Sequence, residues 1–343
     1  QEGELRQGTA SGQETSPPTV RPTSAHSEQE GGSSSSSTQQ MPGPFRGKSA
    51  FSVLYIFAGD HRRSGVKQCL EERQELWGFT LNMREVDTLR GGDQDVLDEA
   101  FWKELMRELA TGCYDLLIIT PPCHTHSRAR SSGGGRPGPR PVRSAHYPWG
   151  FPWLEGKALR SCELANRLVL RTFEAIEIAS SAGACHLLEH PEDLGATPSG
   201  EIPAAIWQHS ELRDIQLRTG ASTWAMFQCN HGASTSKPTR WMSDLEAAAH
   251  EPYQGWPCIG ADSRYRGPLP RSCPHGGHAL KLIGKNANNE FRTAGSASYC
   301  PELCSWVANL ILRSFFGTER LSGGAFRLRV ARPTRASVPV AEA

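Results

Sequence analysis

The stretch that decides the fold is Tyr114-Asp115-Leu116-Leu117-Ile118-Ile119-Thr120-Pro121-Pro122-Cys123. Its centre is a short, continuous apolar run, which predicts a strand buried on both faces of a parallel sheet. The two prolines end the strand, because each fixes φ and lacks a backbone N–H. A thiol, Cys123, therefore follows the carboxyl end of a buried strand in a stiff turn.

Similar strands lie on both sides of this stretch and alternate with helices. The predicted strands are 50–57, 79–86, 114–120, 185–189, 223–229 and 239–243. The predicted helices, where apolar side chains recur at helical spacing, are 66–76, 96–110, 159–182 and 303–316. This alternation predicts an α/β fold with a mostly parallel, doubly wound sheet that helices cover on both faces.

The 343 residues divide by composition into three parts. Residues 1–48 are rich in Ser, Gly, Gln and Pro and cannot bury enough apolar surface to become ordered, so we expect a disordered tail or linker. Residues 49–320 form the predicted α/β domain, which includes an irregular region over 247–292, and residues 321–343 form a disordered basic tail. The chain starts with Gln1 rather than Met, which suits a fragment of a longer protein.

Charge gives a local rather than a global indication of partners. The formal net charge of +1 neither favours nor excludes nucleic acid. The loop after Cys123 is basic and contains no acidic residue among its arginines, which are Arg128, Arg130, Arg136, Arg140 and Arg143. Such a loop is either a solvated surface or a site of phosphate contact.

Cysteine use and hydropathy indicate the compartment. The ten cysteines accompany neither a signal-peptide pattern nor an apolar run long enough to cross a bilayer. We therefore expect reduced thiols, no membrane contact, and a nuclear or cytoplasmic protein of unspecified oligomeric state.

Polar residues gather at the ends of the predicted strands, and open α/β sheets bind ligands beyond the carboxyl ends of their strands. Gly59 would let a ligand approach the backbone closely, or would simply form a tight turn. Glu85 and Asp87 could accept hydrogen bonds from ribose hydroxyls, or could lie in a solvated loop. Glu189 ends an apolar strand, where a carboxylate needs a partner.

The sequence allows two interpretations of Cys123. A stiff turn that aims a thiol out of a strand end suits a nucleophile, whereas the usual fate of a free cysteine is burial as a small apolar side chain. We favour the nucleophile and expect its basic neighbours to lower the pKa of the thiol. These neighbours are His124, His126, Arg128 and Arg130.

The order of these motifs resembles that of the cytosine-C5 DNA methyltransferases, over about residues 50–315. The matching segments are Phe57-Ala58-Gly59, Glu85 with Asp87, Asp95, Pro121-Pro122-Cys123 with Ser127, Leu188-Glu189-His190-Pro191, Lys237-Pro238-Thr239-Arg240 and Thr293-Ala294-Gly295-Ser296-Ala297. The resemblance implies a Rossmann-like methyltransferase fold with a small, irregular, Cys/His-containing insertion.

The resemblance also implies roles for the matching residues. Cys123 would attack C6 of a flipped cytosine, Glu189 would contact N3, and Arg240 would steady the substrate or the loop. The residues that would bind S-adenosylmethionine are Phe57, Gly59, Pro121, Asp95 near the adenine, and Glu85 or Asp87 at the ribose. The residues that would contact DNA are Arg128, Arg130, Arg140 and Lys237.

The chain departs from the family beside each motif. His124 stands where the family has Gln, His190-Pro191 stands where it has Asn-Val, and only Lys237 and Arg240 match its Gln-x-Arg-x-Arg motif. The chain is also similar to functionally uncharacterised algal proteins, some of them linked to mobile elements. Two alternatives therefore stay open: a catalytically degenerate, nucleic-acid-binding relative from a mobile element, and a methyltransferase for RNA or a small molecule.

A separate motif lies in the irregular region. Cys273-Pro274-His275-Gly276-Gly277-His278 holds three candidate zinc ligands, and Cys229 is the candidate fourth. His231 and Cys258 are further candidates for completing the set. The motif predicts a structural zinc that pins a region without a core of its own. The alternative is a loop with incidental polar residues.

Overall fold

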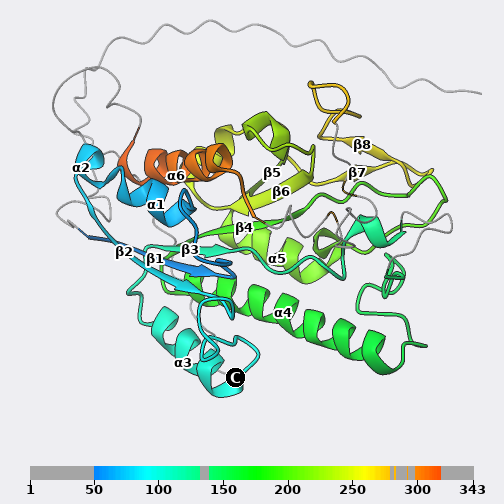
Figure 1. Ribbon diagram of the computed structural model, residues 1–343, viewed down its shortest axis with the longest axis horizontal. Coiled ribbons are helices and arrows are strands. Elements are labelled where there is room, and N and C mark those ends of the chain that lie inside the picture. The colour runs from blue at the N-terminus through cyan, green and yellow to red at the C-terminus, as the bar shows by residue number, and fades with distance from the viewer. Residues whose placement is uncertain (1–49, 132–138, 279–281, 283–291, 293–297, 318–343) are drawn as a thin grey trace, which may run out of the picture. The chain divides into compact units, whose positions relative to one another are not determined.

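The structure is a computed structural model that describes residues 50–131, 139–278, 282, 292 and 298–317 (Figure 1). Its main strands are β1 (Ala50–Ile56), β2 (Thr80–Val86), β3 (Leu116–Ile119), β4 (Cys185–Pro191), β5 (Ser222–Phe227) and β6 (Pro238–Ser243). They form one sheet in the order β2-β1-β3-β4-β6-β5. The predicted tails at 1–48 and 321–343 lie outside the described residues, as do Arg136 and the segment 293–297.

The sheet is mostly parallel, as predicted. Strands β2, β1, β3 and β4 are mutually parallel, and β6 runs antiparallel between β4 and β5. From β1 the chain passes outward to β2 and then crosses back to β3 on the other side of β1. The topological switch point therefore lies between β1 and β3, which is where such sheets bind ligands.

Helices cover both faces of the sheet (Figure 1). One face packs against α1 (Val66–Glu71) and α6 (Pro301–Phe316), and the other against α3 (Glu99–Ala110), α4 (Gly156–Ser181) and α5 (Ser210–Thr219). None of the helices in the described part of the chain combines the length and the apolar character that a bilayer span requires.

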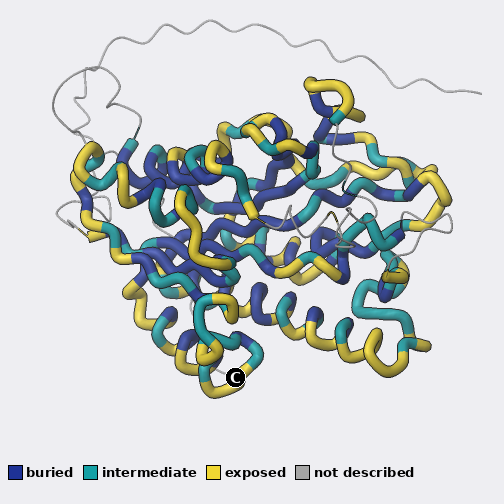
Figure 2. Tube along the Cα trace, in the orientation of Figure 1, coloured by how far each residue is buried: buried dark blue, intermediate teal, exposed yellow. Residues whose placement is uncertain are grey.

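The alternation of side chains in β1 explains the two cores. Phe51, Val53 and Tyr55 point into the core under α6, whereas Leu54 and Ile56 point into the core under α3 and α4. The buried residues lie mainly along the central strands and on the helix sides that face the sheet (Figure 2).

The helices differ from the predictions at two places. The predicted helix 66–76 is divided into α1 and α2 (Gln74–Trp77), because the Arg73 guanidinium binds the Cys69 carbonyl oxygen (Nη1 to O, 2.6 Å) and so satisfies the end of α1. Helix α5 was not predicted. It buries only Leu212 and Ile215, which leaves a weak apolar pattern in the sequence.

The described part of the irregular region contains the 3₁₀ helix η4 (Glu246–His250) and a two-stranded hairpin of β7 (Cys258–Ile259) and β8 (Tyr265–Gly267). A third, small core joins this region to the end of β5. Its buried members are Ala225, Phe227, Cys229, Leu269 and Cys273.

Candidate functional site

The carboxyl ends of three neighbouring strands meet at one edge of the sheet. Strand β3 lies between β1 and β4, and Ile119 of β3 pairs with Leu188, so Glu189 lies one residue beyond this pair. Thr120 fastens the Pro-Cys turn to β1, because its Oγ1 donates a hydrogen bond to the carbonyl oxygen of Phe57 (2.9 Å). The predicted meeting of polar strand ends is therefore confirmed for these three strands.

Cys123, Glu189 and Lys237 interact electrostatically at this edge. Burial raises the pKa of the Cys123 thiol, the positive charge of Lys237 lowers it, and the charge of Glu189 raises it further. Burial also raises the pKa of Glu189, against the effects of Lys237 and of a hydrogen bond from Tyr299. Lys237 enters from the turn before β6, where its φ of 26° is in the left-handed region.

The expected lowering of the thiol pKa is wrong. Burial lowers the pKa of His124, and Arg130 and Arg143 lower it further. Burial also lowers the pKa of His126, followed by His190 and Arg143, so both imidazoles favour the neutral form. Arg128 and Arg130 direct their guanidinium groups to backbone carbonyls. The cation that acts on Cys123 is Lys237, which comes from a distant part of the sequence.

Glu189 has one carboxylate oxygen in a hydrogen bond and one without. The Tyr299 hydroxyl donates to Oε2 (3.0 Å). Oε1 is buried and has no hydrogen-bond partner among the described residues. A buried polar oxygen without a partner costs about 1–3 kcal/mol, which a ligand could recover by donating to the carboxylate or by accepting from the protonated carboxyl. Tyr299 is a site residue that the sequence analysis missed, because nothing in the sequence links it to Glu189.

A cavity of about 480 Å³ opens beside the ends of β1 and β2. This volume is within the range of about 300–1,000 Å³ that is usual for small-molecule sites. The cavity is lined by Tyr55, Ala58, Asp60, His61, Arg62, Arg63, Gly65, Val66, Lys67, Gln68, Glu71, Glu85, Arg90, Tyr299 and Cys304. Tyr299 connects the two features, since its side chain lines the cavity and binds Glu189.

Of the residues predicted to bind a cofactor, Glu85 is the one that lines this cavity. Arg90 holds its carboxylate with two hydrogen bonds, from Nη1 to Oε2 (2.8 Å) and from Nη2 to Oε1 (2.9 Å). Arg90 also donates from Nε to the Gly59 carbonyl oxygen (2.6 Å). Any ligand at Glu85 therefore meets a paired carboxylate, and Arg90 is a second residue that the sequence analysis missed.

The other predicted cofactor residues lie outside the lining of the cavity. Asp87 accepts a hydrogen bond from the Gly59 N–H (Oδ2, 2.9 Å), and Gly59 has a φ of +71°, which favours glycine. Asp95 accepts from the N–H of Leu97 (2.8 Å). Phe57 has a φ of 64°, an uncommon conformation for a bulky residue and one often found at functional sites. The lining of the cavity therefore includes none of Phe57, Gly59, Asp87, Asp95 and Pro121.

Arg240 is fully buried and forms an ion pair. Its Nε and Nη2 donate to Oε2 and Oε1 of Glu192 (2.6 and 2.8 Å). Its Nη1 donates to Thr223 Oγ1 (3.0 Å) and to the Gly255 carbonyl oxygen. Of the two roles that the resemblance implies, direct contact with substrate does not fit this burial, whereas fixing the chain around the site does.

The basic loop is held by its own arginines. Arg128 donates to the carbonyl oxygens of residues 195 and 196, and Arg130 donates to those of residues 124 (2.7 Å) and 140 (2.8 Å). Arg143 is buried and bonds the Pro148 carbonyl oxygen (2.8 Å). Arg140 is exposed. Phosphate contact by this loop stays a prediction, and Arg140 is its most accessible candidate.

Burial lowers the pKa of the His190 ring, which makes the stability of the protein depend on pH. Its ring has no hydrogen-bond partner among the described residues, and burial, followed by Lys237, Arg143 and His209, lowers its pKa from 6.5 to about 3. The folded state thus keeps the ring neutral, while the unfolded chain binds a proton below pH 6.5. The stability contributed by the neutral ring is complete above pH 6.5 and is lost as the pH falls toward 3.

We expect His190→Asn to make the free energy of unfolding less dependent on pH in this window. Urea unfolding at several pH values between 6.5 and 3 would measure the two slopes. His250→Asn, at an exposed histidine at the end of η4, is a control for the substitution itself. Equal slopes for the His190 variant and the parent would contradict the prediction.

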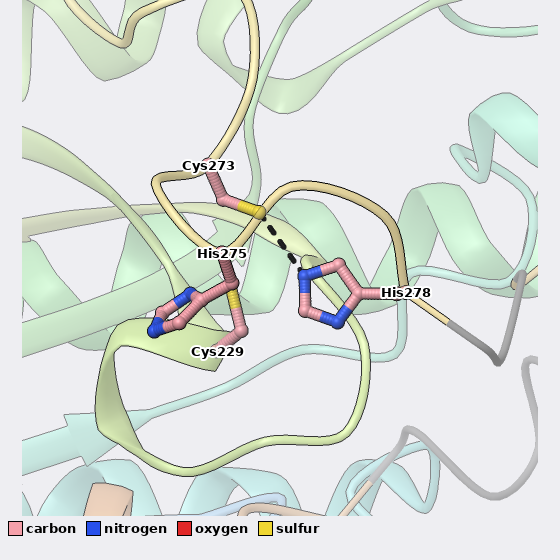
Figure 3. Close-up of side chains that lie close together, drawn as sticks. All are labelled: Cys229, Cys273, His275 and His278. Atoms are coloured by element: carbon pink, nitrogen blue, oxygen red, sulfur yellow. Dashed lines mark hydrogen bonds between the residues drawn. The ribbon is translucent and has the colours of Figure 1, made fainter.

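The four predicted metal ligands lie together (Figure 3). The ligand atoms of Cys229, Cys273, His275 and His278 are all within 4.8 Å of one another. Cys273 Sγ is 3.0 Å from Nε2 of His278. The alternative ligands do not join this group: Cys258 is exposed in β7, and the His231 ring packs on Trp306 (centroids 5.0 Å apart).

Comparison of this chain with protein-family models, with curated proteins and with solved structures gives no match.

Proposed function

We propose that this chain transfers a methyl group from S-adenosylmethionine to C5 of cytosine in DNA through a covalent adduct with Cys123. The observation that carries the proposal is the meeting of Cys123, Lys237 and the unpaired Oε1 of Glu189 at one strand edge, beside a cavity at the β1 end.

The residues at the cavity are compatible with the cofactor. Glu85 offers a carboxylate where the cofactor ribose would lie, and the left-handed turn at Gly59 opens the backbone at the strand end. Lys67 and Arg62, which line the cavity, offer positive charge for a carboxylate. The cofactor, when bound, would supply an electrophilic methyl group.

The protein side chains would carry the remaining steps. The Cys123 thiol gives its proton to a solvent water and its sulfur forms a bond to C6 of the cytosine, while the Glu189 carboxyl, whose raised pKa favours its protonated form, gives its proton to N3. The electron pair displaced to C5 then takes the methyl group. A solvent water takes the C5 proton, the C6–S bond breaks to release the sulfur as a thiolate, and N3 returns its proton to the Glu189 carboxylate, which restores the aromatic ring. The thiolate then takes a proton from water and becomes the free thiol again. Lys237 would stabilise the carboxylate that Glu189 becomes.

Flipping the cytosine out of the duplex costs a few kcal/mol, which contacts with phosphates must offset. The exposed Arg140 is a candidate for such a contact.

A methyl-transfer assay with radiolabelled S-adenosylmethionine tests the proposal directly. Parallel reactions should contain duplex DNA, RNA or no nucleic acid. Label in the DNA that is recovered as 5-methylcytosine is the expected result. Label in RNA alone would favour the RNA methyltransferase instead. No transfer to either nucleic acid would contradict the proposal.

A catalytically degenerate, nucleic-acid-binding protein is the second candidate function. The observation that favours it is the pair of hydrogen bonds from Arg90 to the Glu85 carboxylate inside the cavity. Because these bonds already occupy the carboxylate, it is less available to the cofactor ribose. Isothermal titration with S-adenosylmethionine separates the two candidates. Binding of DNA without binding of the cofactor would support the second.

We expect Glu189→Gln to lower kcat for methyl transfer by about 10²–10⁴-fold, the usual contribution of a general acid. Glutamine keeps the size of the side chain and can still accept from Tyr299, but it cannot give a proton to N3. Glu163→Gln, on the outer part of α4, is a matched control that should leave kcat unchanged. An equal effect of both variants would rule out the specific role of Glu189.

A further inference from the structure

We propose that Cys229, Cys273, His275 and His278 bind one Zn²⁺, and that this ion fixes the turn between β5 and β6 that carries Lys237. Two thiolates and two imidazoles are a donor set that zinc prefers. Tetrahedral Zn²⁺ places its ligand atoms about 3.3–3.8 Å apart, and the four atoms are already within 4.8 Å of one another. Binding therefore needs only a small contraction of the group.

The ligands come from two segments that have little other reason to meet. Cys229 lies in the 3₁₀ helix η3 (Gln228–His231) just after β5, while the other three ligands lie in the loop 273–278 (Figure 3). The apolar core under this contact has five buried members, far fewer than either main core. A metal ion would supply the cross-link that so small a core cannot.

His278 is oriented as a metal ligand would be. Its Nδ1 is 3.1 Å from the Ser234 carbonyl oxygen, an acceptor, so Nδ1 carries the proton and Nε2 is left free for a metal. Nε2 is the atom that points to Cys273. In metal sites a backbone carbonyl usually accepts the hydrogen bond that fixes the tautomer of a ligating histidine. His275 is exposed, which gives an ion a path to the site.

The same contacts reach the turn that positions Lys237. Ser234 lies in this turn and accepts the hydrogen bond from His278. At its far end, the Gln228 N–H donates to the Lys237 carbonyl oxygen (3.3 Å), and Gln228 Nε2 donates to Thr239 Oγ1 (3.0 Å). An ion bound to Cys229 would restrain the neighbouring residue Gln228. Through the hydrogen bond from the Gln228 N–H, it would also restrain Lys237. Metal binding itself does not depend on the proposed methyl transfer.

Zinc content of the full chain, purified after expression with added zinc, tests the site. We expect one zinc per chain, and Co²⁺ added to the reduced, metal-free protein should give a tetrahedral thiolate-cobalt spectrum. His275→Ala should lose most of the zinc, and its exposure makes loss of folding a minor concern. His275→Cys should retain zinc as a three-cysteine, one-histidine set. Cys258→Ser, at an exposed cysteine in the neighbouring hairpin, should retain it fully.

Hydrogen exchange tests the effect on the turn. Removal of zinc with a chelator should speed amide exchange across residues 228–239 and leave α4 unchanged. The proposal is overturned if the folded, reduced protein binds neither Zn²⁺ nor Co²⁺, if Cys258→Ser loses as much zinc as His275→Ala, or if exchange across 228–239 is the same with and without metal. A site that holds zinc in a protein without methyl transfer would leave this inference standing and refute the proposed function alone.

Discussion

Cys123→Ser is expected to reduce methyl transfer to DNA by about 10³-fold or more, the scale seen when a covalent nucleophile is removed. Serine keeps nearly the same shape, but its hydroxyl is a far weaker nucleophile than the thiolate. Burial raises the pKa of the Cys123 thiol, so formation of the reactive thiolate depends on the surrounding site. The serine variant removes this thiolate. Steady-state methyl transfer, with the unfolding temperature as a check of folding, measures this change.

A trapping experiment gives the same prediction a second readout. DNA with 5-fluorocytosine at the target should form an adduct with the protein that survives denaturation, because fluorine at C5 cannot leave as the proton does. Peptide mapping should find the adduct on Cys123. Cys113→Ser is the matched control, since Cys113 is an exposed free cysteine away from the strand ends. An adduct that still forms with the Cys123→Ser variant would contradict the assignment of Cys123 as the nucleophile.

Arg240→Met is expected to lower the free energy of unfolding by about 3–5 kcal/mol, the usual effect of removing one partner from a buried ion pair. Both side chains of the Arg240–Glu192 pair are fully buried. Methionine fills similar space but leaves the Glu192 carboxylate with the Tyr265 hydroxyl (2.8 Å) as its remaining side-chain donor. Urea unfolding near neutral pH measures the loss.

Two further variants separate the buried charge from simple packing. Arg240→Met combined with Glu192→Gln should recover part of the stability, because the uncompensated carboxylate is gone. Arg107→Met removes an exposed ion pair to Glu104 and should cost at most about 1 kcal/mol. Equal costs for Arg107→Met and Arg240→Met would contradict the prediction.

The loss of stability in Arg240→Met should depend on pH, and the direction of this dependence follows from the pKa of Glu192. Burial raises the pKa of Glu192, and Arg240 opposes that rise. Without Arg240 the folded pKa of Glu192 moves higher, so the folded protein takes up a proton that the unfolded chain lacks above pH 4.5. The cost of Arg240→Met should therefore be smallest below pH 4.5 and should grow as the pH rises through the new folded pKa.

The role of Arg240 could not be found from the sequence. Lys237 and Arg240 lie three positions apart in one motif, and the resemblance implied contact with nucleic acid for one and with substrate or loop for the other. Tertiary packing separates them: β6 pairs with β4 and β5, which buries Arg240 in the sheet, while Lys237 stays in the turn at its edge. A short motif fixes neither which side of a sheet a residue faces nor how deeply it lies.

The sequence predicted more of the Cys/His cluster than of the candidate site around Cys123. All four members of the cluster, including the distant Cys229, were predicted from residue type, because cysteine and histidine at close spacing have few alternative uses. The charges around Cys123 could not be predicted in this way. Sequence neighbours such as His124 and Arg130 turned out neutral or bound to carbonyls, while the cation that acts on the thiol is Lys237.

The sequence by itself determined the order of strands and helices and the polar residues at the strand ends. Continuous apolar runs such as 116–119 cannot remain in water, and proline and glycine fix where each run ends. Only the tertiary structure decided which side chains share the site. Tyr299, Lys237 and Arg90 come near Glu189, Cys123 and Glu85 through the pairing of strands and the packing of α6. Electrostatic interactions depend on distance and burial in space, and neither can be read from separation along the chain.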